Sequence, residues 1–153
     1  MTAESLCSPD DIEMTGGPKQ LMTISHPQLC KGAILVMDDD GVIQTLFSTM
    51  LECLGYTTVC ACEGDEALKL YKQAQNDGSP FTGVILDLHN RLGKGGLETL
   101  DSLRELDPEV HAVICSADSD AQAMRQYQTY GFKSALGKPF GLQELQNILL
   151  IDR

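Results

Sequence analysis

The stretch AILVMDDD (33–40) decides the fold, because it places a short, fully apolar run directly before three consecutive aspartates. An uninterrupted apolar run of this kind is typical of a central parallel strand that is buried on both faces. In open sheets covered by helices, ligands bind at the carboxyl ends of the strands. We therefore expect Asp38, Asp39 and Asp40 to lie where such a sheet has its binding site.

Strand-like and helical patterns alternate along the chain from this stretch onward. Short runs that predict strands occur at 33–37, 56–62, 84–86, 110–115 and 134–137. Each run is followed by apolar residues at helical spacing, such as Leu97, Leu100 and Leu103 after the third run. Five strand–helix units of this kind predict an α/β fold, with one parallel sheet, right-handed crossovers and helices on both faces.

Several polar residues are candidate helix caps. Asp40 can cap the first helix and Asp65 the second, because a short carboxylate side chain accepts hydrogen bonds from the free N–H groups at a helix start. Asp118 or Ser119 can cap a single helix that contains residues 121–127. These caps agree with one helix after each predicted strand.

Residues 1–32 differ from the rest of the chain. They hold scattered prolines, glycines and polar residues without a sustained period, which indicates an N-terminal tail or linker. Residues 33–153 are predicted to form one domain. The chain ends a few residues after the last predicted helix, and we expect no further domain after it.

Composition and charge exclude several classes of protein. With 11 basic and 22 acidic residues the formal charge is −11, so direct binding to nucleic acid is not expected. The longest apolar run is far too short to span a membrane and no secretory leader opens the sequence, so we expect a cytoplasmic protein. The six cysteines form no CxxC pair and no matched histidine spacing, so a zinc site is not predicted.

Four of the predicted strands end in groups with complementary chemistry. The first ends in Asp38-Asp39-Asp40, the third in Asp87, the fourth in Ser116 and the fifth in Lys138. Each residue alone is as readily a turn former, a cap or a surface charge. Because the carboxyl ends of parallel strands meet at one edge of the sheet, the set predicts a common site.

This set fits the transfer of a phosphoryl group to a carboxylate. Mg²⁺ prefers oxygen ligands, and clustered Asp38, Asp39 and Asp87 would repel one another without a cation. Asp87 can attack a phosphoryl donor and form an aspartyl phosphate. The transferred group spreads negative charge over its oxygens, and Lys138 and Ser116 can pair with those oxygens.

At these residues the sequence resembles the response-regulator receiver domains of two-component signalling systems. The resemblance covers residues 33 to about 150 and rests on ILVMDDD (34–40), GVILDL (83–88), AVICSAD (112–118) and SALGKPF (134–140). The runs YGFKSALGKPF (130–140) and GVILDLHNRLGKGGLE (83–98) look most like receivers of hybrid sensor histidine kinases. The family implies a flavodoxin-like fold, a doubly wound five-stranded parallel sheet in a three-layer αβα arrangement.

The resemblance assigns a role to each matching position. It implies that Asp87 is the phosphoacceptor and that Mg²⁺, or Mn²⁺ in its place, is bound at the site. Asp39 is then a direct metal ligand, Asp38 binds the metal through a water, and the backbone carbonyl of His89 is a third protein ligand. Asp87 is itself a ligand of the metal.

Three further positions complete the implied site. Ser116 matches the switch hydroxyl, Lys138 the phosphate-pairing lysine, and Pro139 the position of a common cis-proline. The implied phosphodonor is a histidine kinase or a histidine-containing phosphotransfer protein. We expect a signalling receiver that catalyses its own phosphorylation and dephosphorylation and acts on an unknown downstream protein without an attached output domain. Homodimerisation on phosphorylation is compatible with the sequence but is not decided by it.

The sequence departs from the family pattern at two positions. Arg91 stands four residues after the acceptor, where proline is common, and Ala135 stands where an aromatic switch residue is usual. Signalling by an aromatic rotamer change is therefore not expected. The side chain of His89 matches a position that can face the phosphoryl group, so we expect it to affect the lifetime of the phosphorylated form.

Two alternatives stay open on the sequence. A degenerate receiver would act as an interaction module that takes no phosphate, which the departures at Arg91 and Ala135 favour. DDDGV (38–42) also looks like the first motif of haloacid-dehalogenase-type phosphatases, with Asp38 as nucleophile and Asp40 as acid–base. That second reading leaves Asp87 without a role.

Overall fold

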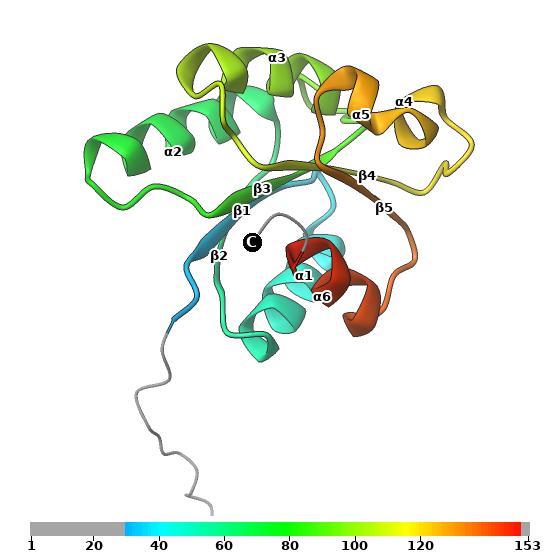
Figure 1. The fold of residues 1–153 in the computed structure, drawn as a ribbon, viewed down its shortest axis with the longest axis horizontal. Helices are drawn as coiled ribbons and strands as arrows, with labels where there is room; N and C mark the ends of the chain where they lie inside the picture. Colours follow the sequence, from blue (N-terminus) through cyan, green and yellow to red (C-terminus); the bar gives the residue numbers. More distant parts are fainter. Residues whose placement is uncertain (1–29, 151–153) are drawn as a thin grey trace, which may run out of the picture.

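The computed structural model describes residues 30–150 of the chain (Figure 1). In chain order its elements are β1 (Ala33–Met37), α1 (Gly41–Cys53), β2 (Thr57–Ala61), α2 (Gly64–Asn76), β3 (Gly83–Asp87), α3 (Gly96–Leu106), β4 (Ala112–Ser116), α4 (Gln122–Arg125), α5 (Tyr127–Tyr130), β5 (Ser134–Gly137) and α6 (Leu142–Leu150). Most of the predicted tail at 1–32 lies outside the described residues. The tail and the domain boundary at 33 therefore remain predictions.

The five strands form one parallel sheet in the order β2-β1-β3-β4-β5. This is the flavodoxin-like order, and the strand order reverses between β1 and β3. Met37 on β1 pairs with Leu86 on β3, and Asp87 pairs with Cys115 on β4. The predicted α/β fold is confirmed, and this register brings the carboxyl ends of the central strands to one edge.

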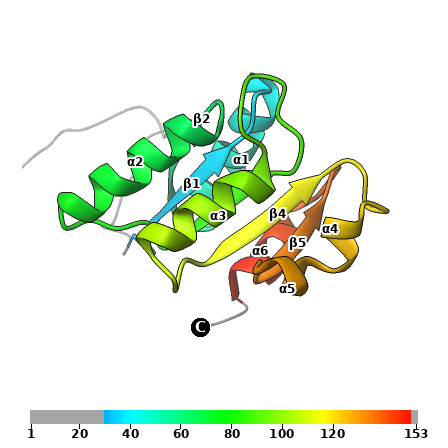
Figure 2. The ribbon, with the colours of Figure 1, turned by 90° about the horizontal axis from the view of Figure 1, so that it is seen from above.

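Helices cover both faces of the sheet. Figure 1 shows α1 and α6 on one face and α2, α3, α4 and α5 on the other, and Figure 2 shows the second group from above. The side chains of β1 alternate between two cores: Ile34 and Val36 face α1 and α6, whereas Leu35 and Met37 face the opposite layer. Burial on both faces is the reason that this strand is apolar throughout.

Two helix starts test the predicted caps. Asp40 caps α1 as predicted, since its Oδ1 accepts a 2.9 Å hydrogen bond from the N–H of Val42. The prediction of Asp65 for α2 is wrong, because Glu63 is the cap. The two carboxylate oxygens of Glu63 accept from the N–H groups of Asp65 and Glu66, so one longer side chain satisfies two free donors.

The region after β4 differs from the single capped helix that the sequence predicts. Two four-residue helices, α4 and α5, replace it, and the chain leaves helical geometry at Gln126. Asp118 accepts from the N–H of Asp120 in a turn and does not cap α4, and no side chain caps that helix. None of the α5 residues is fully buried, although Tyr127 and Tyr130 are partly buried and pack against the core.

The helices of residues 30–150 are shorter than a membrane span requires. The longest of them, α1 and α2, have 13 residues each. None of the described helices combines the length and the hydropathy needed to cross a bilayer.

Candidate functional site

Three carboxylates meet at the carboxyl edge of the sheet. Asp38 and Asp39 follow β1 directly and Asp87 is the last residue of β3, the strand beside β1. One oxygen from each residue lies within 4.8 Å of the other two. Asp38 is only 1% exposed and Asp87 only 6%. Negative charges this close and this buried require cations to balance them.

The ammonium group of Lys138 lies between two of these carboxylates. Its Nζ donates to Oδ2 of Asp38 at 2.8 Å and to Oδ1 of Asp87 at 3.1 Å. Lys138 follows β5, and its backbone N–H donates to the carbonyl of Ser116 at the end of β4. The Lys138–Pro139 peptide bond is cis, as the sequence predicts. The lysine is thus held on the same edge as the aspartates.

Burial and charge set the pKa values of this pair. Burial raises the pKa of Asp87, and the neighbouring Asp38 raises it further, although the hydrogen bond from Lys138 opposes both effects. For Lys138, burial acts to lower the pKa, but its hydrogen bonds to Asp38 and Asp87 outweigh burial and raise it to about 12. Lys138 is therefore a permanent cation at neutral pH.

Asp39 has a different cation as its partner. The backbone N–H and the Nε of Arg91 both donate to Oδ2 of Asp39, at 2.9 Å and 3.1 Å. The hydrogen bond from the backbone N–H has the largest effect on the pKa of Asp39 and lowers it. The side-chain hydrogen bond lowers this pKa too, and burial, which acts to raise it, does not outweigh them. Sequence reasoning recognised Arg91 only as a departure from proline. Its contact with Asp39 was missed because that contact depends on the path of the β3–α3 loop, which no local sequence motif indicates.

Gln44 is a second residue that sequence reasoning missed. From α1 its Nε2 donates to the carbonyl of Asp38 at 2.7 Å and to that of Ala61 at 3.2 Å. These hydrogen bonds link the carboxyl ends of β1 and β2. An amide side chain in the first turns of the helix that follows the aspartates is the one signal in the sequence.

Ser116 and His89 lie on the same edge of the sheet. Ser116 is buried at the end of β4, one residue beyond Cys115, the partner of Asp87 in the register. Its Oγ accepts from the N–H of Asp118, so its own O–H stays available as a donor. His89 lies two residues after Asp87 and is exposed. The roles predicted for these two residues remain predictions.

The donor chemistry of the site fits a hard divalent cation. Carboxylate oxygens are the ligands that Mg²⁺ prefers, and two oxygens bound to one Mg²⁺ lie at most about 4.2 Å apart because each is about 2.1 Å from the ion. The limit of 4.8 Å on the separations of the Asp38, Asp39 and Asp87 oxygens is close to this value. This limit is compatible with a site in which two carboxylates bind the metal directly and the third binds it through a water.

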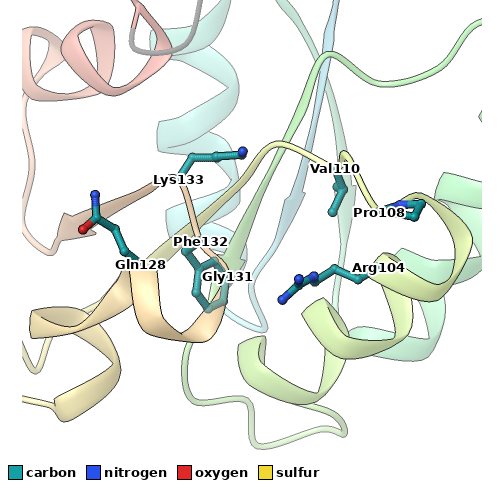
Figure 3. A pocket seen from close by; sticks show the side chains of 7 residues that line it. All are labelled: Arg104, Pro108, Val110, Gln128, Gly131, Phe132 and Lys133. Atoms are coloured by element: carbon teal, nitrogen blue, oxygen red, sulfur yellow. The ribbon is translucent and has the colours of Figure 1, made fainter.

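A pocket of about 480 Å³ opens at the opposite edge of the sheet (Figure 3). Val110 lies just before β4 and Lys133 just before β5, so this pocket lies at the amino ends of these strands. Arg104, at the end of α3, also lines it. The pocket is therefore separate from the carboxylate cluster.

A doubly wound parallel sheet with three carboxylates and a lysine at its carboxyl edge is the arrangement expected of a signalling receiver domain, and comparison with known proteins identifies the family. The model of the response regulator receiver domain matches residues 34–150. The chain belongs to this family. The family predicted from the sequence is thereby confirmed.

Individual relatives agree with this assignment. The probable C4-dicarboxylate response regulator DctR of Bacillus subtilis is 30% identical over 76% of this chain, which spans 50% of the length of that regulator. Two solved structures share the fold. A response regulator from Burkholderia pseudomallei, with a phosphorylated aspartic acid, a calcium ion and citrate, has a TM-score of 0.66 at 26% identity, covering 79% of this chain and 68% of that one. The receiver domain of a Pseudomonas aeruginosa sensor histidine kinase, with magnesium in its active site cleft, has a TM-score of 0.67 at 23% identity, covering 77% and 93%.

Proposed function

We propose that this receiver domain accepts a phosphoryl group on Asp87, in a Mg²⁺-dependent reaction with a phosphohistidine donor. One observation carries the proposal: Asp87 ends β3 within 4.8 Å of two further aspartates and 3.1 Å from the ammonium group of Lys138. A nucleophilic carboxylate, metal-binding carboxylates and a fixed cation are the groups that this chemistry requires.

The transfer consists of one displacement at phosphorus. A carboxylate oxygen of Asp87 forms a bond to the phosphorus atom, and the bond from phosphorus to the donor nitrogen of histidine breaks with its electron pair on that nitrogen. Lys138 is already hydrogen-bonded to Asp87, so it is placed to pair with an oxygen of the transferred group without moving far. The hydroxyl of Ser116 donates to another of these oxygens.

The metal site of this proposal uses the aspartates and one carbonyl. Asp39 and Asp87 bind Mg²⁺ directly, Asp38 binds it through a water, and the backbone carbonyl of His89 is the third protein ligand. When bound, Mg²⁺ neutralises charge on the phosphoryl oxygens and on the aspartates. Mn²⁺ has similar ligand preferences and is expected to replace it.

The partners follow from this chemistry. A histidine kinase or a histidine-containing phosphotransfer protein supplies the phosphoryl group, and an unidentified downstream protein binds the phosphorylated form. Membership of the receiver family supports this assignment of partners. The phosphorylated aspartate of the Burkholderia pseudomallei relative supports the acceptance of a phosphoryl group by a carboxylate. Autodephosphorylation, homodimerisation on phosphorylation and a cytoplasmic location stay predictions.

The two alternatives are less well supported. The phosphatase reading needs Asp40 as an acid–base, but the carboxylate of Asp40 is exposed and caps α1. The hypothesis of an inert interaction module rests on Arg91 and Ala135. The proximity of Asp38, Asp39, Asp87 and Lys138 supports phosphoryl acceptance over this hypothesis.

The experiment is the intact mass of the full chain after incubation with acetyl phosphate, with Mg²⁺ or with EDTA. Asp87→Asn is the test variant, and Asp77→Asn, an exposed carboxylate at the end of α2, is the matched control. We expect one phosphoryl adduct that requires Mg²⁺, forms on the wild type and on the control, and is lost in Asp87→Asn.

Each other outcome favours an alternative. No adduct on folded wild type supports the inert module. Steady release of phosphate that survives Asp87→Asn and stops in Asp38→Asn supports the phosphatase. Light scattering on the phosphorylated sample measures whether it dimerises.

A further inference from the structure

The contact between Arg91 and Asp39 joins a surface cation to the predicted metal site. The side chain of Arg91 is 83% exposed, whereas that of Asp39 is 8% exposed. Both donors of Arg91 reach the same oxygen, Oδ2. One oxygen of a carboxylate in the three-aspartate cluster therefore already has a positively charged partner from the protein itself.

The loop that carries Arg91 is fixed in place by its neighbour, Asn90. The Oδ1 of Asn90 accepts from the N–H groups of Leu92 and Gly93, and its Nδ2 donates to the carbonyl of Cys62 at 2.7 Å. These hydrogen bonds hold residue 91 beside Asp39. Proline at this position would have no N–H and no guanidinium, so both hydrogen bonds to Asp39 depend on the residue found here.

We propose that Arg91 is a built-in competitor of Mg²⁺ for Asp39 and that it lowers the affinity of the site for the metal. The proposal rests on the proposed function, which makes Asp39 a direct ligand. Mg²⁺ entering the site meets a carboxylate whose Oδ2 is occupied and whose charge is partly balanced. The guanidinium also repels the incoming dication, and must move away or remain as an adjacent like charge.

The same loop provides a matched control. Lys94 is also a cation of the β3–α3 loop, but its Nζ pairs with Asp65 on α2 at 3.1 Å. Within residues 30–150, no ion pair joins Lys94 to Asp38, Asp39 or Asp87. Arg91→Gln and Lys94→Gln each remove one positive charge from this loop. Arg91→Gln keeps the backbone N–H that donates to Asp39, so a difference between these variants measures the contact of the guanidinium with Asp39 and not the net charge.

The experiment is a calorimetric titration of Mg²⁺ into the full chain, without phosphodonor and at constant ionic strength. We expect Arg91→Gln to bind Mg²⁺ about tenfold more tightly than wild type, as the removal of a charge adjacent to a dication predicts. Lys94→Gln should change the dissociation constant by less than about twofold, because the charge of Lys94 is paired with Asp65 and is partly screened by solvent.

The outcomes separate this inference from the proposed function. If the wild type binds Mg²⁺ and Arg91→Gln binds it no more tightly, the role of Arg91 is refuted but the metal site is not. The same conclusion holds if Arg91→Gln and Lys94→Gln raise the affinity equally. If neither the wild type nor either variant binds Mg²⁺, the proposed metal site is refuted, and the proposed role of Arg91 is refuted with it. Tighter binding in Arg91→Gln alone establishes Arg91 as a determinant of metal affinity.

Discussion

Lys138 and Asp87 are 51 positions apart in the sequence, yet Nζ of Lys138 donates a 3.1 Å hydrogen bond to Oδ1 of Asp87. The lysine therefore already contacts the carboxylate of Asp87, the proposed phosphoacceptor, in the unphosphorylated protein. Its second hydrogen bond, to Asp38, keeps the ammonium group between both carboxylates. A charge fixed in this way does not have to be reoriented during the reaction, which is the condition for effective electrostatic catalysis.

Removing this charge should slow phosphorylation. Lys138→Ala is expected to lower the rate of adduct formation from acetyl phosphate roughly a hundredfold, because a pre-positioned donor to the phosphoryl oxygens is lost. Lys72→Ala, at an exposed lysine on α2, should leave the rate unchanged. Time courses of intact mass measure both rates, and equal rates for the two variants would refute this role.

The acceptor carboxylate should reduce the stability of the metal-free protein. Burial raises the pKa of Asp87, so its ionised form destabilises the fold at neutral pH, and this cost disappears as the pH falls and the carboxyl is protonated. In EDTA, Asp87→Asn should be more stable than wild type by about 1 kcal/mol at neutral pH.

Mg²⁺ should reverse that order, because it balances the carboxylates of the wild type. Urea unfolding with EDTA and with Mg²⁺ measures both effects, and Asp77→Asn serves as the control. Equal stabilisation by Mg²⁺ of the wild type and of Asp87→Asn would contradict the prediction.

A second buried polar contact lies outside the site. The hydroxyl of Tyr71 donates to Oδ2 of Asp107 at 2.6 Å. Burial and this carboxylate raise the pKa of Tyr71 above its ordinary value of 10.0. Tyr71→Phe should cost about 2 kcal/mol of unfolding free energy at about pH 8, as the loss of a hydrogen bond to a charged group predicts.

The pH dependence of this contact has a defined sign. Because the folded-state pKa of Tyr71 is raised, its stabilising contribution is complete below pH 10.0 and is lost as the pH rises further. The difference between wild type and Tyr71→Phe should therefore shrink in urea unfolding at about pH 11. The control is Tyr130→Phe, at a half-buried tyrosine of α5. If the difference in unfolding free energy between wild type and Tyr71→Phe stays the same at both pH values, the hydroxyl does not titrate as expected.

Close packing beside the acceptor makes Gly96 intolerant of a side chain. A Cβ at Gly96, the first residue of α3, would lie 2.9 Å from the carbonyl oxygen of Asp87 and 2.7 Å from Cδ1 of Ile114. Gly96→Ala should destabilise the fold by about 1–3 kcal/mol. Gly41→Ala is the control at the first residue of α1, where a Cβ meets nothing within 4 Å. Similar unfolding free energies for both variants would refute the packing argument.

Regular patterns predicted the framework well. The apolar run 33–37 predicts β1 with its observed bounds, because a strand buried on both faces must be apolar throughout. Predictions at element ends were weaker. Asp65 is a suitable cap by residue type, but Glu63 reaches the free N–H groups of α2. The helix predicted over 121–127 is split at Gln126, and no glycine, proline or other local signal in the sequence marks that break.

The sequence by itself determined which groups stand at the strand ends and that they share one edge of the sheet, since parallel strands in register must bring their carboxyl ends together. Only the tertiary structure decided how the charges are paired. Lys138 lies between Asp38 and Asp87, and Arg91 contacts Asp39 across 52 positions. These pairings depend on loop paths and side-chain directions that arise when distant segments pack, and no local pattern of residues encodes them.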